Sequence, residues 1–331
     1  MNHRLVAVCK KYLSVVAPRF RRRYLAMASG ISIAAALSVA SYPAAAYQFV
    51  AGATAAAVTT EAVTTTAGCG KLGPTTGLFN LNTTDGLGTI RTFLVQVPAD
   101  YSPTKPYALT FVFHGANANS SQSYSWGLQN ASGASEAAIF VFPDGIAFKS
   151  YGVGWDDRTH GYDLPFFDNM VKKLETSYCV NSSRIFAAGF SWGGDFVTGL
   201  ACNRGSVLRA VAVNSASDEY NDHTNYLTYQ NLPCAGTVHP PLRYEHAIGG
   251  DNAYPSPDFA TTSKLLQSFA ACSATCASPT TSVASSTTAM TCVTYNGCGK
   301  ELIECSFAAS IGHALPPNWA ADTWAFFQTF Q

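Results

Sequence analysis

Acidic side chains are absent from the first 46 residues, which carry seven Lys and Arg side chains. An apolar stretch from Met27 to about Ala40 follows, and three alanines ending at Ala46 close the segment. The apolar stretch is shorter than the ~20 residues that a membrane-spanning helix needs, which argues against a membrane anchor. A basic segment, a short apolar run and small residues in this order predict a secretory signal peptide over residues 1–46.

An excess of positive charge is absent from the chain as a whole, which balances 20 Lys and Arg against 20 Asp and Glu. Removal of the seven cations of the signal leaves 13 basic against 20 acidic side chains, a net charge near −7. A mildly acidic surface argues against nucleic acid as a partner and, after signal cleavage, against a membrane. We therefore expect a secreted, extracellular protein that binds neither.

The cysteines have no histidine at the spacing of a zinc finger, which argues against a zinc site. Ten cysteines are present, and Cys9 falls in the predicted signal. An exported chain with this many cysteines is expected to form disulfide bonds, and because nine is odd, at least one thiol is unpaired or paired between chains. Four N-x-S/T sequons, at Asn82, Asn119, Asn130 and Asn181, also suit an exported glycoprotein.

Internal repeats are absent, and about 265 residues are enough for one large domain but not for a second module. Residues 47–68 are rich in Ala and Thr and are predicted to form a disordered tether. The domain itself is predicted over residues 69–331. A second low-complexity run, Ser273–Thr291, lies between cysteines and is predicted to be a surface loop held by disulfides.

Short apolar runs alternate with helical patterns through this domain. The predicted strands are Ile90–Val97, Tyr107–Phe113, Ile139–Phe142, Ile185–Gly189, Leu208–Val213, Leu242–Ile248 and Leu302–Phe307. Apolar residues at helical spacing predict a helix over 166–178. The alternation predicts an α/β fold, with a doubly wound, mostly parallel sheet flanked by helices. Ligands of such sheets bind beyond the carboxyl ends of the strands.

The segment Gly189–Gly193 matches the motif G-x-S-x-G between an apolar strand and a helical pattern. This is the context of a nucleophile elbow, in which glycines permit a strained turn that exposes the serine. Ser191 is therefore the predicted nucleophile. The backbone N–H groups of Trp192 and of Ala116, in the loop after Tyr107–Phe113, are the predicted oxyanion donors.

A serine hydroxyl needs a base to remove its proton, and in this type of fold the order along the chain is Ser, acid, His. His313 follows the last predicted strand in a loop that contains Gly and Pro, and is the predicted base. The alternatives are His223, His239 and His246. His114 precedes Ser191 and is predicted to brace the loop in which it lies.

Asp251 lies at the carboxyl end of the predicted strand Leu242–Ile248 and is the predicted acid, which would orient and stabilise the imidazolium. Its competitors are Asp218, Asp222 and Asp258. Trp155 and Trp319 are candidate substrate-binding residues that, with Trp192, would line a pocket for an aromatic acyl group. The alternative is that these indoles belong to the core.

Several motifs occur in a fixed order: FHGA at 113–116, VFPDG at 141–145, GFSWGG at 189–194, GGD at 249–251 and GHALPP at 312–317. Together they resemble the secreted feruloyl esterase and polyhydroxybutyrate depolymerase group of carbohydrate esterases, in the α/β-hydrolase superfamily. The resemblance implies the triad Ser191, Asp251 and His313, a polysaccharide-linked or polymeric ester as substrate, and no metal or organic cofactor.

A feruloyl esterase acting on plant cell-wall polysaccharide is the leading hypothesis. A poly(3-hydroxybutyrate) depolymerase and an acetylxylan esterase would use the same triad and are the alternatives. A depolymerase often carries an additional polymer-binding module, for which this chain has no room. An inactive binding protein on a hydrolase fold is the remaining hypothesis, and the ordered Ser, Asp and His argue against it.

The exported protein is expected to begin near Tyr47, because the small-residue cleavage site lies directly before it. Mass spectrometry of the secreted protein, intact and after digestion, would measure the boundary. Exported protein that still carries residues 1–46 would contradict the prediction.

Overall fold

The computed structural model describes residues 64–71, 75–147, 152–156, 161–216, 240–248 and 290–330, and the backbone of 279–284. All of them belong to one compact unit, Val63–Gln331. The predicted signal peptide and residues 47–63 of the predicted tether lie outside the described residues. Residues 64–68 are bonded to the domain, since Gly68 N–H donates to Glu175 C=O at 2.9 Å, so the domain includes the end of the predicted tether.

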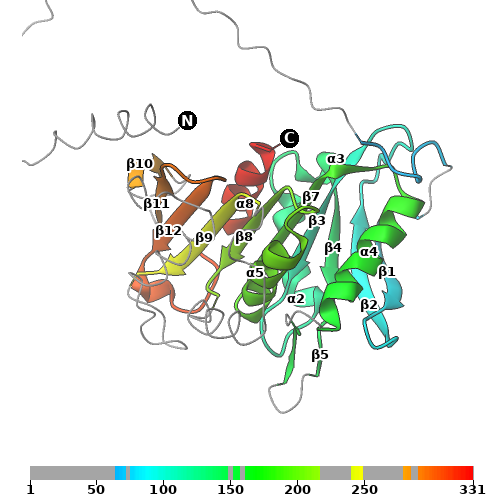
Figure 1. Cartoon of the computed structure of the whole chain (residues 1–331), viewed down its shortest axis with the longest axis horizontal. Coiled ribbons are helices and arrows are strands. Elements are labelled where there is room, and N and C mark those ends of the chain that lie inside the picture. The colour runs from blue at the N-terminus through cyan, green and yellow to red at the C-terminus, as the bar shows by residue number, and fades with distance from the viewer. Residues whose placement is uncertain are drawn as a thin grey trace, which may run out of the picture. The chain divides into compact units, whose positions relative to one another are not determined.

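One large sheet crosses the domain (Figure 1). Over the described residues it has ten strands in the order β1-β2-β4-β3-β7-β8-β9-β12-β11-β10. The strands are β1 (Gly77–Thr84), β2 (Ile90–Val97), β3 (Tyr107–Phe113), β4 (Ala138–Pro143), β7 (Val180–Phe190), β8 (Ala210–Asn214), β9 (Leu242–Ala247), β10 (Pro279–Ala284), β11 (Met290–Tyr295) and β12 (Leu302–Phe307). The central strands, from β4 to β12, run parallel, and antiparallel pairs close both ends. The predicted α/β fold is confirmed.

The central strands are mostly apolar because both faces of the sheet are covered. Every residue of β3 and β4 is buried, whereas β2, near one end of the sheet, alternates between buried and less buried positions. The helices are α2 (Ser120–Ser125), α3 (Ala134–Ala137), α4 (Asp163–Ser177), α5 (Trp192–Arg204) and α8 (Trp319–Gln328), with short 3-10 turns η1 (Leu128–Asn130) and η2 (Ala309–Ile311). A small hairpin, β5 (Ile146–Ala147) and β6 (Val153–Gly154), stands apart from the main sheet.

Two apolar cores lie on opposite faces of the sheet. Helices α4 and α5 pack on one face, where Phe167 of α4 contacts Phe111 with their ring centroids 4.8 Å apart. Helix α8 covers the other face, where Phe327 stacks on Phe186 at 4.7 Å. Burial of a phenylalanine side chain contributes roughly 1.5–3 kcal/mol, so these contacts hold the helices firmly on the sheet. Helix α4 begins three residues earlier than predicted, at Asp163.

The prediction of a surface loop over Ser273–Thr291 is wrong for part of that run. Residues 279–284 form β10, which pairs with β11 at the end of the sheet. Thr, Ser and Val make up most of this strand, and β-branched residues fit an extended backbone. The strand was not predicted because this low-complexity segment lacks the alternation of apolar and polar residues that marks a half-buried strand.

The predicted disulfide bonds are confirmed. Cys69 is joined to Cys179, which directly precedes β7, and Cys292 of β11 is joined to Cys305, its partner in register on β12. Cys202 and Cys298 are also disulfide-bonded, so none of the cysteines in the described part of the chain is free. The unpaired thiol stays a prediction. None of the described helices is long and apolar enough to cross a membrane.

The two disulfides are expected to stabilise the fold unequally. They close loops of very different length, since the sequence separation is 110 residues for Cys69–Cys179 and 13 for Cys292–Cys305. In the chain-entropy model, loops of these sizes correspond to about 4.7 and about 3 kcal/mol. Urea unfolding of the two double Cys→Ser variants should show a larger loss for the first pair. An equal or reversed order would contradict the entropic account.

Candidate active site

Ser191 lies in a sharp turn between β7 and α5. Its φ of 54° and ψ of −128° place it in a region that residues with a side chain rarely adopt. A Cβ on Gly189 would lie 2.2 Å from Gly193 O, and a Cβ on Gly193 would lie 2.3 Å from Phe113 O. Both contacts are with backbone, so neither glycine tolerates a side chain. The glycines of the motif are therefore required by the close packing of the turn.

His313 is brought to Ser191 from 122 residues away in the sequence. It follows β12 and η2, and Gly312 before it has a φ of 65°, which favours glycine. The distance between His313 Nε2 and Ser191 Oγ is 2.8 Å, a hydrogen bond. Ser191 is 4% exposed, and the ring of Phe190 packs against the imidazole with centroids 4.9 Å apart. The structure thus places the predicted nucleophile and the predicted base in contact.

The alternative bases do not form such a pair in the described residues. His246 lies within β9, and its Nε2 contacts Glu304 Oε1 of β12 at 3.1 Å. His223 and His239 lie outside the described residues. So do Asp251, the predicted acid, and its competitors Asp218, Asp222 and Asp258.

The loop after β3 lies beside Ser191. A Cβ on Gly115 would lie 3.2 Å from Ser191 Cβ, so the loop passes within van der Waals contact of the turn. Ala116 follows and is exposed. Trp192 is the first residue of α5, so its N–H points out of the amino end of that helix. Both predicted oxyanion donors therefore belong to segments that adjoin Ser191.

Trp155 and Trp319 are buried, at 1% and 3% exposed. Trp155 packs edge-on against Phe113 with centroids 5.1 Å apart, and its Nε1–H donates to His114 C=O at 2.8 Å. Trp319 packs against Trp126 at 5.9 Å. We correct the prediction that these two indoles line a substrate pocket, because core packing covers them.

Two aromatic side chains were not predicted: Phe190, which contacts the His313 ring, and Trp126, which contacts Phe190. Phe190 and Trp126 are half-buried, and their rings meet edge-on with centroids 5.7 Å apart. Trp126 follows the short polar helix α2, where no apolar pattern marks it. Phe190 is the variable residue before Ser191 in the motif, and its place next to the nucleophile was the one available signal.

A buried polar network supports the other side of the turn. Asn214 C=O, at the end of β8, accepts a hydrogen bond from Ser191 N–H at 3.0 Å. The Asn214 amide donates to Glu245 Oε2 at 2.8 Å, and Arg243 Nε donates to Glu245 Oε1 at 2.6 Å. Burial raises the pKa of Glu245, and Arg243 opposes that rise. The network ties β8 to β9 beneath the nucleophile.

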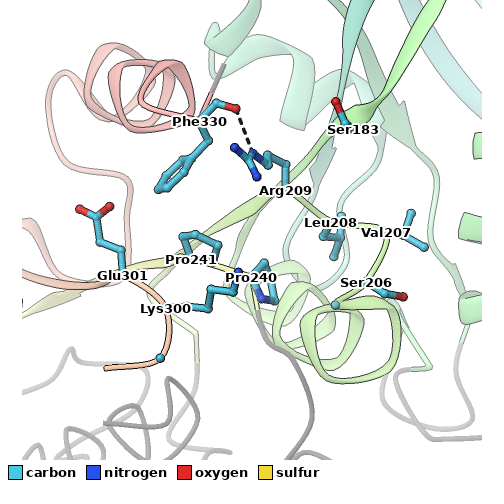
Figure 2. Close-up of a pocket in the computed structure, with 12 residues that line it drawn as sticks. Ser183, Ser206, Val207, Leu208, Arg209, Pro240, Pro241, Lys300, Glu301 and Phe330 are labelled. Carbon is cyan, nitrogen blue, oxygen red and sulfur yellow. Dashed lines mark hydrogen bonds between the residues drawn. The ribbon is translucent and has the colours of Figure 1, made fainter. Parts of the chain in front are cut away.

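A cavity of about 520 Å³ lies where the parallel strands begin, at the end of the strands opposite Ser191. Figure 2 shows the residues that line it. Three of its lining residues directly precede strands: Arg209 precedes β8, Pro241 precedes β9 and Glu301 precedes β12. Ser191, in contrast, directly follows β7. The cavity is therefore separate from the pair formed by Ser191 and His313. No group of three or more His, Cys, Asp or Glu side chains suited to a metal ion occurs among the described residues.

The mostly parallel sheet, the strained serine turn and the contact of that serine with a histidine define an α/β-hydrolase. No protein-family model matches the chain. It is 32% identical over 227 residues to a protein named probable feruloyl esterase C from Aspergillus niger, covering 60% of this chain and 78% of that protein. It is 36% identical over 174 residues to feruloyl esterase C of Emericella nidulans, and 32% over 163 residues to feruloyl esterase D of Neurospora crassa.

The last two matches cover 48% and 46% of this chain, and the chain spans only 58% and 54% of those relatives. The chain belongs to the feruloyl esterase family of carboxylic ester hydrolases, and the predicted resemblance is confirmed. An acetyl xylan esterase structure from Aspergillus awamori superposes with a TM-score of 0.58 at 16% identity, over 76% of this chain and 100% of that one. This likeness shows the same fold.

Substitution of Gly193 by Ala is expected to disrupt the site, because the new Cβ would meet two carbonyl oxygens of β3 and its loop at 2.3 and 2.5 Å. A displacement of about 1 Å at the nucleophile lowers the rate about 100-fold. Gly194→Ala is the matched control and should lose less activity, since its Cβ would meet the Ala216 side chain at 3.2 Å and the carbonyl oxygens of Asn214 and Gly189 at 3.3 Å, which are tight contacts but about 1 Å longer than those of Gly193→Ala. Ester hydrolysis and thermal unfolding of both variants would measure the difference. Equal losses would contradict the steric account.

Proposed function

We propose that this protein is a secreted serine esterase that hydrolyses feruloyl esters of plant cell-wall polysaccharide. The observation that carries the proposal is the 2.8 Å contact between His313 Nε2 and Ser191 Oγ at the strained turn. The names of the relatives support the feruloyl group as the acyl part of the substrate. Disulfide bonds in the described domain support an extracellular site of action.

The proposed reaction begins with attack on the ester. Ser191 Oγ bonds to the carbonyl carbon while its proton passes to His313 Nε2. The negative charge moves to the carbonyl oxygen, where the N–H groups of Trp192 and Ala116 would stabilise it. Helix α5, which starts at Trp192, adds the positive end of its dipole.

The intermediate then collapses to an acyl-enzyme. The bond between the carbonyl carbon and the sugar oxygen breaks, and His313 gives its proton to that oxygen. Water next attacks the acyl carbon, with its proton passing to His313, and the bond to Ser191 Oγ breaks as that oxygen regains a proton. The products are the free carboxylic acid and the polysaccharide. Asp251 would bond to the other imidazole nitrogen and stabilise the charged ring.

The surroundings of His313 suit an aromatic acyl group. Phe190 presents a half-buried ring to the imidazole, and the half-buried ring of Trp126 packs against Phe190. Aromatic rings in offset or edge-on contact add about 0.5–1.5 kcal/mol beyond the area they bury. We propose that these two rings, in place of Trp155 and Trp319, contact the feruloyl ring.

Ser191→Ala and His313→Ala should each abolish most hydrolysis of methyl ferulate, and the double variant should be about as inactive as either single variant, because the residues act as one unit. Asp251→Asn should lose less activity, since the imidazole remains. In another triad hydrolase, removal of the acid cost roughly 10⁴ in rate against roughly 10⁶ for the nucleophile. Steady-state kinetics on acetylated xylan and poly(3-hydroxybutyrate) as well would define the acyl group.

A serine-directed phosphonate provides the control. It should label Ser191 in the wild type and far more slowly in His313→Ala, because an unactivated hydroxyl reacts poorly. Wild-type turnover in Ser191→Ala would end the serine-esterase proposal. If Ser191→Ala loses activity and His313→Ala does not, another histidine is the base.

A further inference from the structure

The loop that follows β3 is held by hydrogen bonds to its neighbours. His114, which is 0% exposed, contacts Gly115 O through Nδ1 at 2.7 Å. The N–H of Gly145, just before β5, lies 2.8 Å from His114 Nε2. The indole N–H of Trp155, just after β6, donates to His114 C=O at 2.8 Å. The loop is thus fixed against both ends of the β5–β6 hairpin.

These contacts determine the state of the His114 ring. Gly145 N–H donates to Nε2, so Nε2 carries no proton, and Nδ1–H donates to Gly115 C=O. Burial lowers the pKa of His114, which favours the neutral ring. Both ring nitrogens are therefore engaged by backbone groups in fixed roles.

The bond to Gly115 C=O also sets the direction of a second group. Gly115 C=O and Ala116 N–H belong to one peptide unit, which is planar and trans. The two groups of such a unit point in opposite directions. Because His114 holds the carbonyl, it also fixes where the Ala116 N–H points.

Arg91 and Asp163 join the two ends of the hairpin. Arg91 Nη2 donates to Asp144 C=O at 2.7 Å, and Asp156 N–H donates to Asp163 Oδ2 at 2.5 Å. Arg91 Nη1 is paired with Asp163 Oδ1. Asp144 directly precedes Gly145 and Asp156 directly follows Trp155. The two residues that bond to Arg91 and Asp163 are therefore sequence neighbours of the two residues that bond to His114.

The Arg91–Asp163 pair is almost completely buried, at 3% and 0% exposed. Burial raises the pKa of Asp163 to about 6, while Arg91 opposes that rise. The guanidinium also lies over the ring of Phe166, 4.3 Å from its centroid. Replacing a buried ion pair with apolar residues is often neutral or stabilising, so stability alone does not account for it.

We propose that the Arg91–Asp163 pair is a positioning element of the active site, which acts through the β5–β6 hairpin and His114 to aim the Ala116 N–H at the oxyanion. The pair does not touch Ser191 or the substrate. The inference rests on the proposed function, because it requires Ala116 N–H to stabilise the transition state.

Asp163→Asn and Arg91→Met test the proposal, with methyl ferulate as substrate. Loss of one oxyanion donor lowers kcat by about 10²–10³, so a misdirected donor should lower kcat about 10- to 100-fold. KM should stay within about three-fold, since the ground state gains little from this donor. Asp168→Asn is the matched control: it removes an ion pair of the same helix, with Arg204 at 2.7 Å, away from the hairpin, and should leave kcat unchanged.

Two further variants separate positioning from folding. Trp155→Phe removes the bond to His114 C=O while it keeps an aromatic ring at this buried position, although a smaller one. His114→Gln keeps an acceptor for Gly145 N–H where His114→Ala keeps none. Both milder variants should fold, and His114→Gln should recover part of the kcat that His114→Ala loses. An arylboronic acid, which forms a tetrahedral anion on Ser191, should bind each variant more weakly by the factor lost in kcat/KM. Ferulate, which is planar, should bind equally well.

Wild-type kcat in Asp163→Asn and Trp155→Phe would overturn the proposal. A loss of kcat that only matches the unfolded fraction of each variant would also overturn it. So would an equal weakening of boronate binding and ferulate binding, since either result would mean a purely structural role. The failure of the proposed function is distinct, because it appears as turnover in Ser191→Ala. If Ser191→Ala is inactive while Asp163→Asn keeps its kcat, the positioning inference alone fails.

Discussion

The close approach of α5 to β3 is the constraint on which the site depends. Gly193 packs so tightly against the end of β3 that a Cβ would lie 2.3 Å from Phe113 O. This contact presses the serine turn onto the carboxyl edge of the sheet and holds Ser191 at a φ of 54°. It also places the loop after β3 beside the nucleophile. The strained backbone persists because close packing and the bond from Ser191 N–H to Asn214 C=O leave it no alternative.

The sequence was sufficient to predict strands and site residues whose signal comes from their immediate neighbours in the chain. Strand β3 has the predicted bounds because a continuous apolar run defines a buried parallel strand. Strand β12 also has the predicted bounds, although Glu304 and Ser306 interrupt its apolar residues. Ser191 and His313 were predicted because glycines mark both turns. The Arg91–Asp163 pair gave no signal, since a single charge in an exposed-looking strand and another 72 residues later reveal nothing of their contact. The burial of Trp155 was equally hidden, because an indole suits a pocket and a core alike.

Two buried ion pairs lie on opposite sides of the serine turn. Arg91–Asp163 is linked to the loop after β3, and Arg243–Glu245 is linked through Asn214 to Ser191. Desolvation makes such pairs expensive, but their hydrogen bonds have fixed directions, which apolar contacts lack. Preorganised donors stabilise a transition state only if they need not move when charge develops. The placement of the two pairs on either side of the serine turn is consistent with that requirement.

The two histidines at this edge differ in chemistry because their surroundings differ. His114 is fully buried, and backbone groups engage both of its ring nitrogens, so it has no lone pair available for a substrate proton. His313 is only half-buried, and its Nε2 faces a hydroxyl at 2.8 Å. A ring that accepts and returns a proton in each cycle must have one nitrogen directed at the reacting group. By that criterion His313 suits the proposed role of base, and His114 suits the proposed role of holding a peptide plane in place.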